Sequence, residues 1–201
     1  MASVAISPKE VSELRARTGA GMMDCKRALE EAGGDMEKAA EILRKKGIAK
    51  ADKRASRTAS QGTVVSYIHH NGQVGVLVEL NSETDFVART DTFQQLARDI
   101  ALHVASADPI GVSAADVPAE LIERERRIAE EQVIAEDKPE AVRAKIVEGK
   151  VKKFIAERTL LEQPYVRDDK KTVGDLVKEV SGTLGEAVTV RRFARFQIGA
   201  A

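Results

Sequence analysis

The chain has 201 residues, of which 43% are hydrophobic and 32% charged, enough to pack one domain or a small and a larger one. Lys plus Arg and Asp plus Glu number 32 each, and this zero net charge argues against a protein that mainly binds a phosphate backbone. The single Cys25 excludes an intrachain disulfide, and the lack of a secretory signal or an apolar run of about 20 residues predicts a cytoplasmic protein with no membrane partner.

Residues 7–47 are expected to form three short helices. Ser7 and Glu10 have the spacing of a capping box at the first helix start, and glycine-containing turns separate the helices. Gly47 stands where the third helix is expected to end. The second and third helices carry apolar stripes at helical spacing, made of Cys25, Ala28, Leu29, Ala32, Met36, Ala39, Ala40 and Leu43. These stripes predict a compact three-helix bundle within residues 1–52.

A basic segment rich in Ala and Ser follows at residues 53–60, which predicts a partly helical linker and a domain boundary. Residues 64–70 and 73–80 are β-rich runs on either side of Asn71-Gly72, the pair that favours a two-residue type I′ turn. That register predicts one covered sheet face, made of Val65, Tyr67, Val74, Val76, Val78 and Leu80.

Several helices are predicted after this hairpin. A helix over residues 91–107 is expected to cover the sheet with Phe93, Leu96, Ala97, Ile100, Ala101 and Val104. Two further helices are expected near 119–136 and 139–158, separated at a proline. Another helix is expected to begin at Thr172, with Asp175 three residues later completing its cap.

The last segment, residues 187–198, has the pattern of a third strand. Its apolar residues are expected to share one face, formed by Val188, Val190, Ala194, Phe196 and Ile198. A hairpin, several helices and a late strand predict an α+β core domain over residues 61–201, with a three-stranded antiparallel sheet packed by helices.

No catalytic, metal or nucleotide site is predicted. The Thr18–Gly21 turn follows a helix and lacks a Gly-Lys-Ser/Thr sequence, so a helix-to-helix turn is preferred over a phosphate loop. Cys25 lies on an apolar stripe, where a cysteine is usually a small core residue. His69, His70 and His103 lack the spacing of metal ligands. The expectation is therefore a protein that is not an enzyme and has no cofactor of its own.

Two exposed segments are candidates for partner binding. Met22-Met23 begins the second helix, and either at least one methionine projects toward a partner or one fills the small bundle. The loop around Asp85 and Phe86 joins the second strand to the long helix. From residue types alone, Phe86 is expected to be a hydrophobic staple in the core.

The sequence resembles the elongation factor Ts family. Residues 18–29 (TGAGMMDCKRAL) and 79–88 (ELNSETDFVA) resemble its two signatures, and three shorter segments follow in the expected order: 148–154 (EGKVKKF), 161–166 (LEQPYV) and 191–196 (RRFARF). The resemblance implies an N-terminal bundle of ubiquitin-associated (UBA-like) type. It also implies a single core domain, as in short members that act as homodimers and form 2:2 complexes.

The resemblance further implies nucleotide exchange on elongation factor Tu in translation elongation, with no bond chemistry and no direct nucleic-acid binding. In the family, the second signature acts beside the partner's GDP phosphates and magnesium, and the bundle contacts the partner's nucleotide domain. The positions of this chain that match these contacts are Thr84, Asp85, Phe86, Val87, Met22, Met23 and Arg15.

Two other function classes remain open at this point. A scaffold or chaperone-like module would use the bundle to bind other proteins, or the basic linker to contact ribosomal RNA. A thiol enzyme would require Cys25 to be exposed and reactive.

Overall fold

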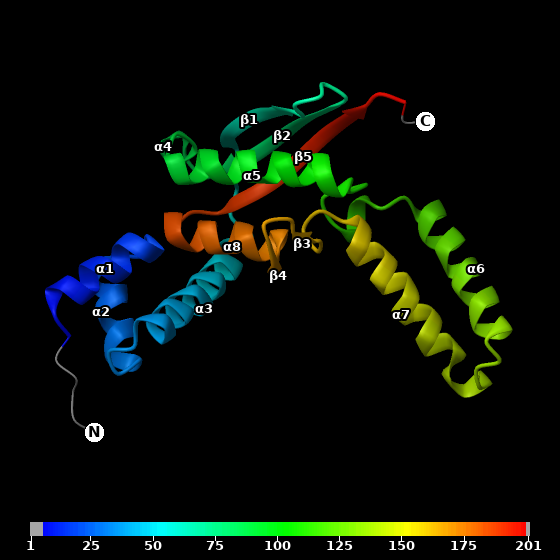
Figure 1. Cartoon of the computed structure of the whole chain (residues 1–201), viewed down its shortest axis with the longest axis horizontal. Coiled ribbons are helices and arrows are strands. Elements are labelled where there is room, and N and C mark those ends of the chain that lie inside the picture. Colours follow the sequence, from blue (N-terminus) through cyan, green and yellow to red (C-terminus); the bar gives the residue numbers. More distant parts are fainter. Residues whose placement is uncertain (1–5, 200–201) are drawn as a thin grey trace. The chain divides into compact units, whose positions relative to one another are not determined.

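The computed structural model describes residues 6–199 and confirms the α+β class (Figure 1). The first part of the chain forms α1 (Pro8–Thr18), α2 (Met22–Glu31), α3 (Met36–Arg54), β1 (Gln61–Ile68), β2 (Val74–Ser82), α4 (Asp85–Ala88) and α5 (Asp91–Ala107). The remainder forms a 3₁₀ turn (Ala114–Asp116), α6 (Ala119–Ala135), α7 (Glu140–Arg158), β3 (Pro164–Tyr165), β4 (Asp168–Thr172), α8 (Val173–Leu184) and β5 (Val188–Gln197).

The described residues divide into two compact units. The first unit holds the described residues up to Gly62 together with Asn81–Gln94 and Val177–Thr189. The second unit holds Thr63–Leu80, Gln95–Leu176 and the described residues from Val190 onward. The boundaries proposed from the sequence, with a linker at residues 53–60, stay a prediction.

The three-helix bundle of the first unit forms as its cap signals predict. The Oγ atom of Ser7 accepts from the Glu10 backbone at 3.3 Å, and the Glu10 carboxylate accepts from the Ser7 backbone at 2.7 Å. Asp35 caps α3 by accepting from two backbone N–H groups. The predicted stripes form the bundle core, whose buried members are Val11, Leu14, Cys25, Ala28, Leu29 and Ala39.

The third helix is longer than predicted, because it continues through Gly47 to Arg54. Gly47 lies against Gly182 of α8, where a Cβ added to Gly182 would come within 2.7 Å of the Gly47 carbonyl oxygen. Ion pairs join the same two helices, Arg44 to Glu179 at 3.4 Å and Lys178 to Asp52 at 2.9 Å. The glycine therefore serves a close helix crossing, and the predicted helix end at Gly47 is wrong.

The hairpin keeps its predicted register but not its predicted turn. The His69 N–H donates to the Val74 carbonyl at 2.9 Å, and the Gly72 N–H donates to the His69 carbonyl at 2.7 Å. These bonds close a four-residue loop, in which Gly72 has φ +69° while Asn71 is not left-handed. A type I′ turn requires positive φ at both central residues, so the two-residue loop is wrong.

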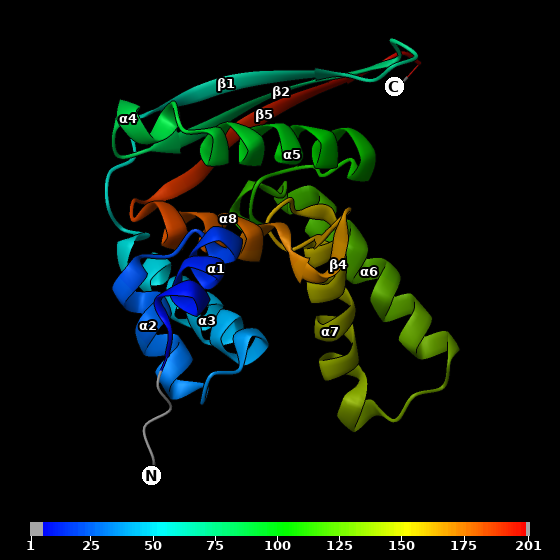
Figure 2. The ribbon, with the colours of Figure 1, turned by 60° about the vertical axis from the view of Figure 1, so that its left-hand side comes forward.

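The second unit contains most of a three-stranded antiparallel sheet in the order β1-β2-β5. Figures 1 and 2 show α5 running along this sheet. The predicted covering residues of α5 are all buried, as are Val76, Val78 and Leu80 of the central strand. The predicted pairing of one sheet face with this helix is therefore confirmed.

The last strand departs from the predicted pattern after its second buried residue. Val188 and Val190 are buried as expected, but Arg191 and Arg192 are both exposed, so the alternation shifts by one residue. Phe196 is consequently 69% exposed and Ile198 74% exposed. The prediction that Ala194, Phe196 and Ile198 face the core is wrong, because period-2 patterning fails where a strand is irregular.

The rest of the second unit is a helical hairpin and a small second sheet. α6 and α7 lie side by side (Figure 2) and bury Ala129, Val133, Val147 and Val151, as the two predicted helices require. β3 and β4 pair as a two-stranded antiparallel sheet that was not predicted. α8 begins as predicted, with the Asp175 N–H donating to Thr172 Oγ1 at 3.0 Å.

Candidate functional site

The candidate site is centred on α4, the single helical turn between β2 and α5. Thr84 is its N-cap, with Oγ1 accepting from the Val87 backbone at 3.4 Å. At the other end, the Gln94 side chain donates to the Ala88 carbonyl at 2.7 Å and Thr90 Oγ1 donates to the Val87 carbonyl at 2.8 Å. These side-chain bonds hold a turn that is too short to be stable alone.

Phe86 projects from this turn with 80% of its surface exposed. Its neighbour Ala88 is buried and Val87 is half-buried, so the turn anchors itself through these residues and leaves the aromatic ring outside. The expectation of a core staple is therefore wrong. A large apolar ring left in water on an anchored turn is typical of a contact residue for another protein.

Asp85 begins the turn and carries a half-exposed carboxylate beside the ring. Arg89, one turn later, donates to this carboxylate at 2.7 Å. An ion pair of this kind at the surface contributes little to stability, so the Asp85 carboxylate can leave Arg89 and pair with a cation of a partner. Asp85 and Phe86 together present one negative charge and one apolar ring on the same exposed turn.

The second group of predicted contact residues lies on the helical bundle. Met22 and Met23 begin α2 and are 54% and 64% exposed, so the alternative that one of them fills the bundle is wrong. Arg15 is exposed on α1. These residues and the α4 turn belong to the same compact unit but stand on different helices.

The residues considered for chemistry have structural roles. Cys25 is fully buried, its thiol lies 3.7 Å from the Ala20 carbonyl, and burial raises the pKa of this thiol. The Thr18–Gly21 segment is a helix-to-helix turn, in which Gly19 has φ +67°. Within residues 6–199, no three His, Cys, Asp or Glu side chains gather as a metal site requires. Helices that are long and apolar enough to cross a membrane are also lacking in that range.

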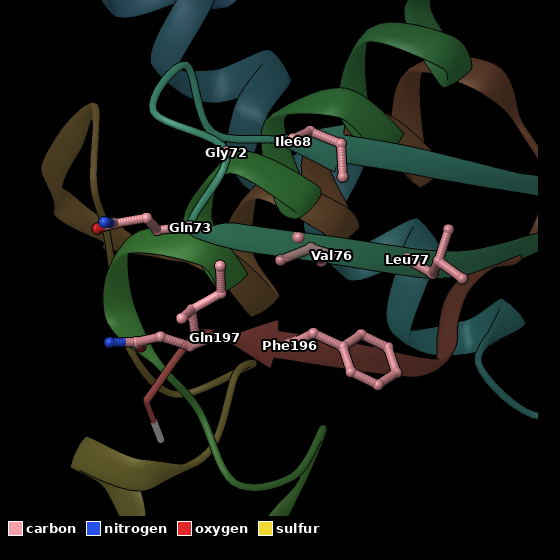
Figure 3. Close-up of a pocket in the computed structure, with 9 residues that line it drawn as sticks. Ile68, Gly72, Gln73, Val76, Leu77, Phe196 and Gln197 are labelled. Carbon is pink, nitrogen blue, oxygen red and sulfur yellow. The ribbon is translucent and has the colours of Figure 1, made fainter.

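One surface was missed from the sequence, the outer face of the three-stranded sheet. Figure 3 shows Ile68, Leu77 and Phe196 on three adjacent strands, around a groove of about 520 Å³. Val64 of β1 is also exposed, as is Ile198, which directly follows β5. The apolar Val64, Ile68 and Leu77 occupy the parity opposite to the predicted covered face, and this signal could have revealed the surface.

Comparisons with known proteins identify one family. The family model described as "Elongation factor TS" matches residues 22–200. The chain is 56% identical over 194 residues to "Elongation factor Ts" of Carboxydothermus hydrogenoformans, covering 96% of this chain and 89% of the relative. The protein of the same name from Thermosipho melanesiensis is 55% identical over 194 residues, with 96% and 99% covered. The one from Oleidesulfovibrio alaskensis is 53% identical over 196 residues, with 98% and 99% covered. This chain belongs to the elongation factor Ts family.

Proposed function

We propose that the protein is a guanine nucleotide exchange factor for elongation factor Tu in cytoplasmic translation elongation. Its family membership supplies the partner, and the exposure of Phe86 on an anchored turn is the observation that carries the mechanism. If the Phe86 ring were packed in the core of this protein, it could not insert into a partner. Because the ring is exposed on a capped turn, it can insert with little loss of conformational entropy.

In this mechanism the α4 turn weakens the partner's hold on GDP. Bound GDP is held by donors around its phosphates and by a magnesium ion whose charge offsets theirs. Insertion of Phe86 displaces the groups that form this cradle, and Asp85 places a negative charge close to the magnesium and phosphates. Thr84 and Val87 fix the turn from either side. GDP then has fewer favourable contacts and leaves faster.

Exchange requires no bond chemistry, because the coupling between two ligands of one protein is reciprocal. If this protein weakens GDP binding, a newly bound nucleotide weakens the binding of this protein by the same free energy. The protein stays bound to nucleotide-free elongation factor Tu until GTP binds, and the protein then dissociates. It needs no cofactor of its own, since the nucleotide and the magnesium belong to the partner, and it contacts no nucleic acid directly.

The bundle is proposed to supply a second contact, on the partner's nucleotide domain. Met22 and Met23 expose flexible thioether side chains that adapt to a partner surface, and Arg15 adds an exposed cation on α1. A second contact of this kind raises affinity without itself disturbing the phosphates. The two contacts therefore have separable effects, binding for the bundle and GDP release for the turn.

The test uses purified elongation factor Tu loaded with a fluorescent GDP. Substoichiometric amounts of this protein should release the label from all of the elongation factor Tu over many turnovers when unlabelled nucleotide is present. A complex isolated without nucleotide should dissociate when GDP is added. A scaffold or chaperone-like module would bind irrespective of nucleotide and leave the release rate unchanged, and either result would contradict the proposal.

We also propose that the protein is a homodimer that forms 2:2 complexes, joined through the outer sheet face defined by Val64, Ile68, Leu77, Phe196 and Ile198. An apolar sheet face is best covered by a second sheet, and a twofold axis supplies an identical one. Light scattering should give twice the chain mass, and Leu77→Asp should give a monomer. A monomer mass for the unaltered protein at micromolar concentration would contradict this proposal.

A further inference from the structure

Two carboxylates behind the α4 turn form a reciprocal brace with the α8–β5 connection. The Glu186 carboxylate accepts from Thr84 twice, from its backbone N–H at 3.0 Å and from its Oγ1 at 2.7 Å. In return, the Glu83 carboxylate accepts from the Ala187 backbone N–H at 2.7 Å. Two neighbouring residues on one segment thus exchange hydrogen bonds with two neighbouring residues on another, about a hundred positions away in the sequence.

Each of the two segments that form this brace is also held by a hydrogen bond from a buried serine. Ser82 is fully buried and its hydroxyl donates to the Thr84 carbonyl at 2.8 Å. Ser181 is also buried and its hydroxyl donates to the Glu186 carbonyl at 2.6 Å. The carboxylate of Glu186 therefore has little freedom to leave Thr84, and the N-cap of α4 is tied to the C-terminal end of α8.

We propose that Glu186 is a positioning residue for exchange, which acts through Thr84 to fix the direction in which Phe86 projects. This inference rests on the proposed function of the α4 turn. Phe86 itself packs little against the chain, so its orientation depends on the backbone of a four-residue helix. That backbone is in turn fixed at its N-cap by Glu186. Glu83 completes the brace from the other side.

The chemistry of the brace explains why a carboxylate is required. An ionised carboxylate is an acceptor only, and its two oxygens match the two donors of Thr84. Hydrogen bonds to an ionised group are shorter and stronger than neutral ones. Glutamine at position 186 would retain one acceptor oxygen for the Thr84 backbone N–H, and its NH₂ group would have to donate to the Thr84 hydroxyl. The substitution Glu186→Gln therefore replaces two charge-assisted bonds by neutral ones with almost no change in volume.

The test is a double-mutant cycle on the GDP release rate from elongation factor Tu, measured at saturating exchange factor. Glu186→Gln alone should slow release about tenfold, as expected when two charge-assisted hydrogen bonds become neutral ones. In a Phe86→Ala background the same substitution should have no further effect, because the side chain that Glu186 positions is already absent.

The chain offers a matched control in Asp116, whose carboxylate accepts from the backbone N–H of Ser113 at 2.8 Å and from its hydroxyl at 3.1 Å. Asp116→Asn neutralises the same kind of bonds elsewhere and should release GDP at the unaltered rate. Where Glu186→Gln fails to fold, Glu186→Asp keeps the charge, shortens the side chain away from Thr84 and should show the same dependence on Phe86.

The outcomes separate this inference from the proposed function. Equal slowing by Glu186→Gln with and without Phe86, or no slowing at all, overturns the positioning role and leaves the function of the α4 turn in place. A Phe86→Ala variant that releases GDP at the unaltered rate overturns the role of the turn, and with it the inference.

Discussion

The buried imidazole of His103 lies with its Nε2 atom 3.0 Å from Oε1 of Gln163. Its Nδ1 atom accepts from the Val166 backbone N–H at 3.3 Å, so the ring is neutral and its proton is on Nε2. The Gln163 amide donates in turn to the carbonyls of Ala107 and Glu157, at 3.3 and 2.8 Å. One imidazole thus links α5, the end of α7 and the β3 segment within the second unit.

Stability is predicted to fall in mild acid because of this link. Burial lowers the pKa of His103 below its usual 6.5, so the unfolded chain binds a proton that the folded chain excludes. The stabilisation is complete above about pH 6.5 and declines as the pH falls below that value. Urea unfolding should give a lower free energy of unfolding at pH 5.5 than at pH 7.5.

The control for this pH dependence is His103→Gln, which should be less stable at pH 7.5 but should lose less stability between the two pH values. His70→Gln changes an exposed imidazole and should keep the slope of the unaltered protein. Equal slopes for His103→Gln and the unaltered protein would assign the acid sensitivity to other groups.

The glycine crossing of α3 and α8 predicts opposite effects of two Gly→Ala substitutions. Gly182→Ala would place a Cβ 2.7 Å from the Gly47 carbonyl oxygen, and this overpacking should cost about 2 kcal/mol of stability. Gly149 lies within α7 with open space around its Cα, so Gly149→Ala should stabilise by up to about 1 kcal/mol. Thermal unfolding followed by circular dichroism measures both. A stable Gly182→Ala protein would show that the two helices do not approach so closely.

Cys25 is predicted to be inert in the native protein. The thiol is buried in the bundle core, and burial raises its pKa, which reduces the reactive thiolate. Reaction with an aromatic disulfide reagent should be at least about 100-fold slower in buffer than in 6 M urea, since it requires local opening of the bundle. Rapid reaction in buffer would revive the possibility of a thiol enzyme.

The bundle contact predicts a loss of affinity without a loss of maximal rate. Replacing Met22 and Met23 by alanine should raise the half-saturating concentration for GDP release about tenfold and leave the saturated rate unchanged, because these residues contribute binding only. Ile134→Ala, which truncates an apolar side chain that is 62% exposed on α6, is the control and should change neither value. A lower saturated rate for the methionine variant would place the bundle in the release step.

Local sequence patterns predicted most of the fold because helix caps and apolar periodicity act over a few residues. The Ser7–Glu10 and Thr172–Asp175 caps form as expected. The errors lie where tertiary contacts override a local signal. Gly47 allows α3 to approach Gly182, a residue that is distant in the sequence, and therefore does not end the helix. The irregularity at Arg191-Arg192 changes which residues of β5 are exposed.

The candidate site shows the same limit. Residue types alone favour a buried Phe86, because an aromatic residue at a helix start usually packs inward. In the structure, the half-buried Val87 and the buried Ala88 anchor the turn instead of Phe86, and the ring therefore stays exposed. The brace from Glu186 was also beyond sequence reasoning, since no local pattern joins it to Thr84.

The central claim is that the exposed ring of Phe86 opens the partner's nucleotide site, and stopped-flow release of fluorescent GDP from elongation factor Tu tests it most directly. At saturating concentration, Phe86→Ala should slow release at least about 30-fold, as expected for the loss of an interface hot spot, while its melting temperature stays near that of the unaltered protein. Release at the unaltered rate, from a folded variant that still binds elongation factor Tu, would contradict the account.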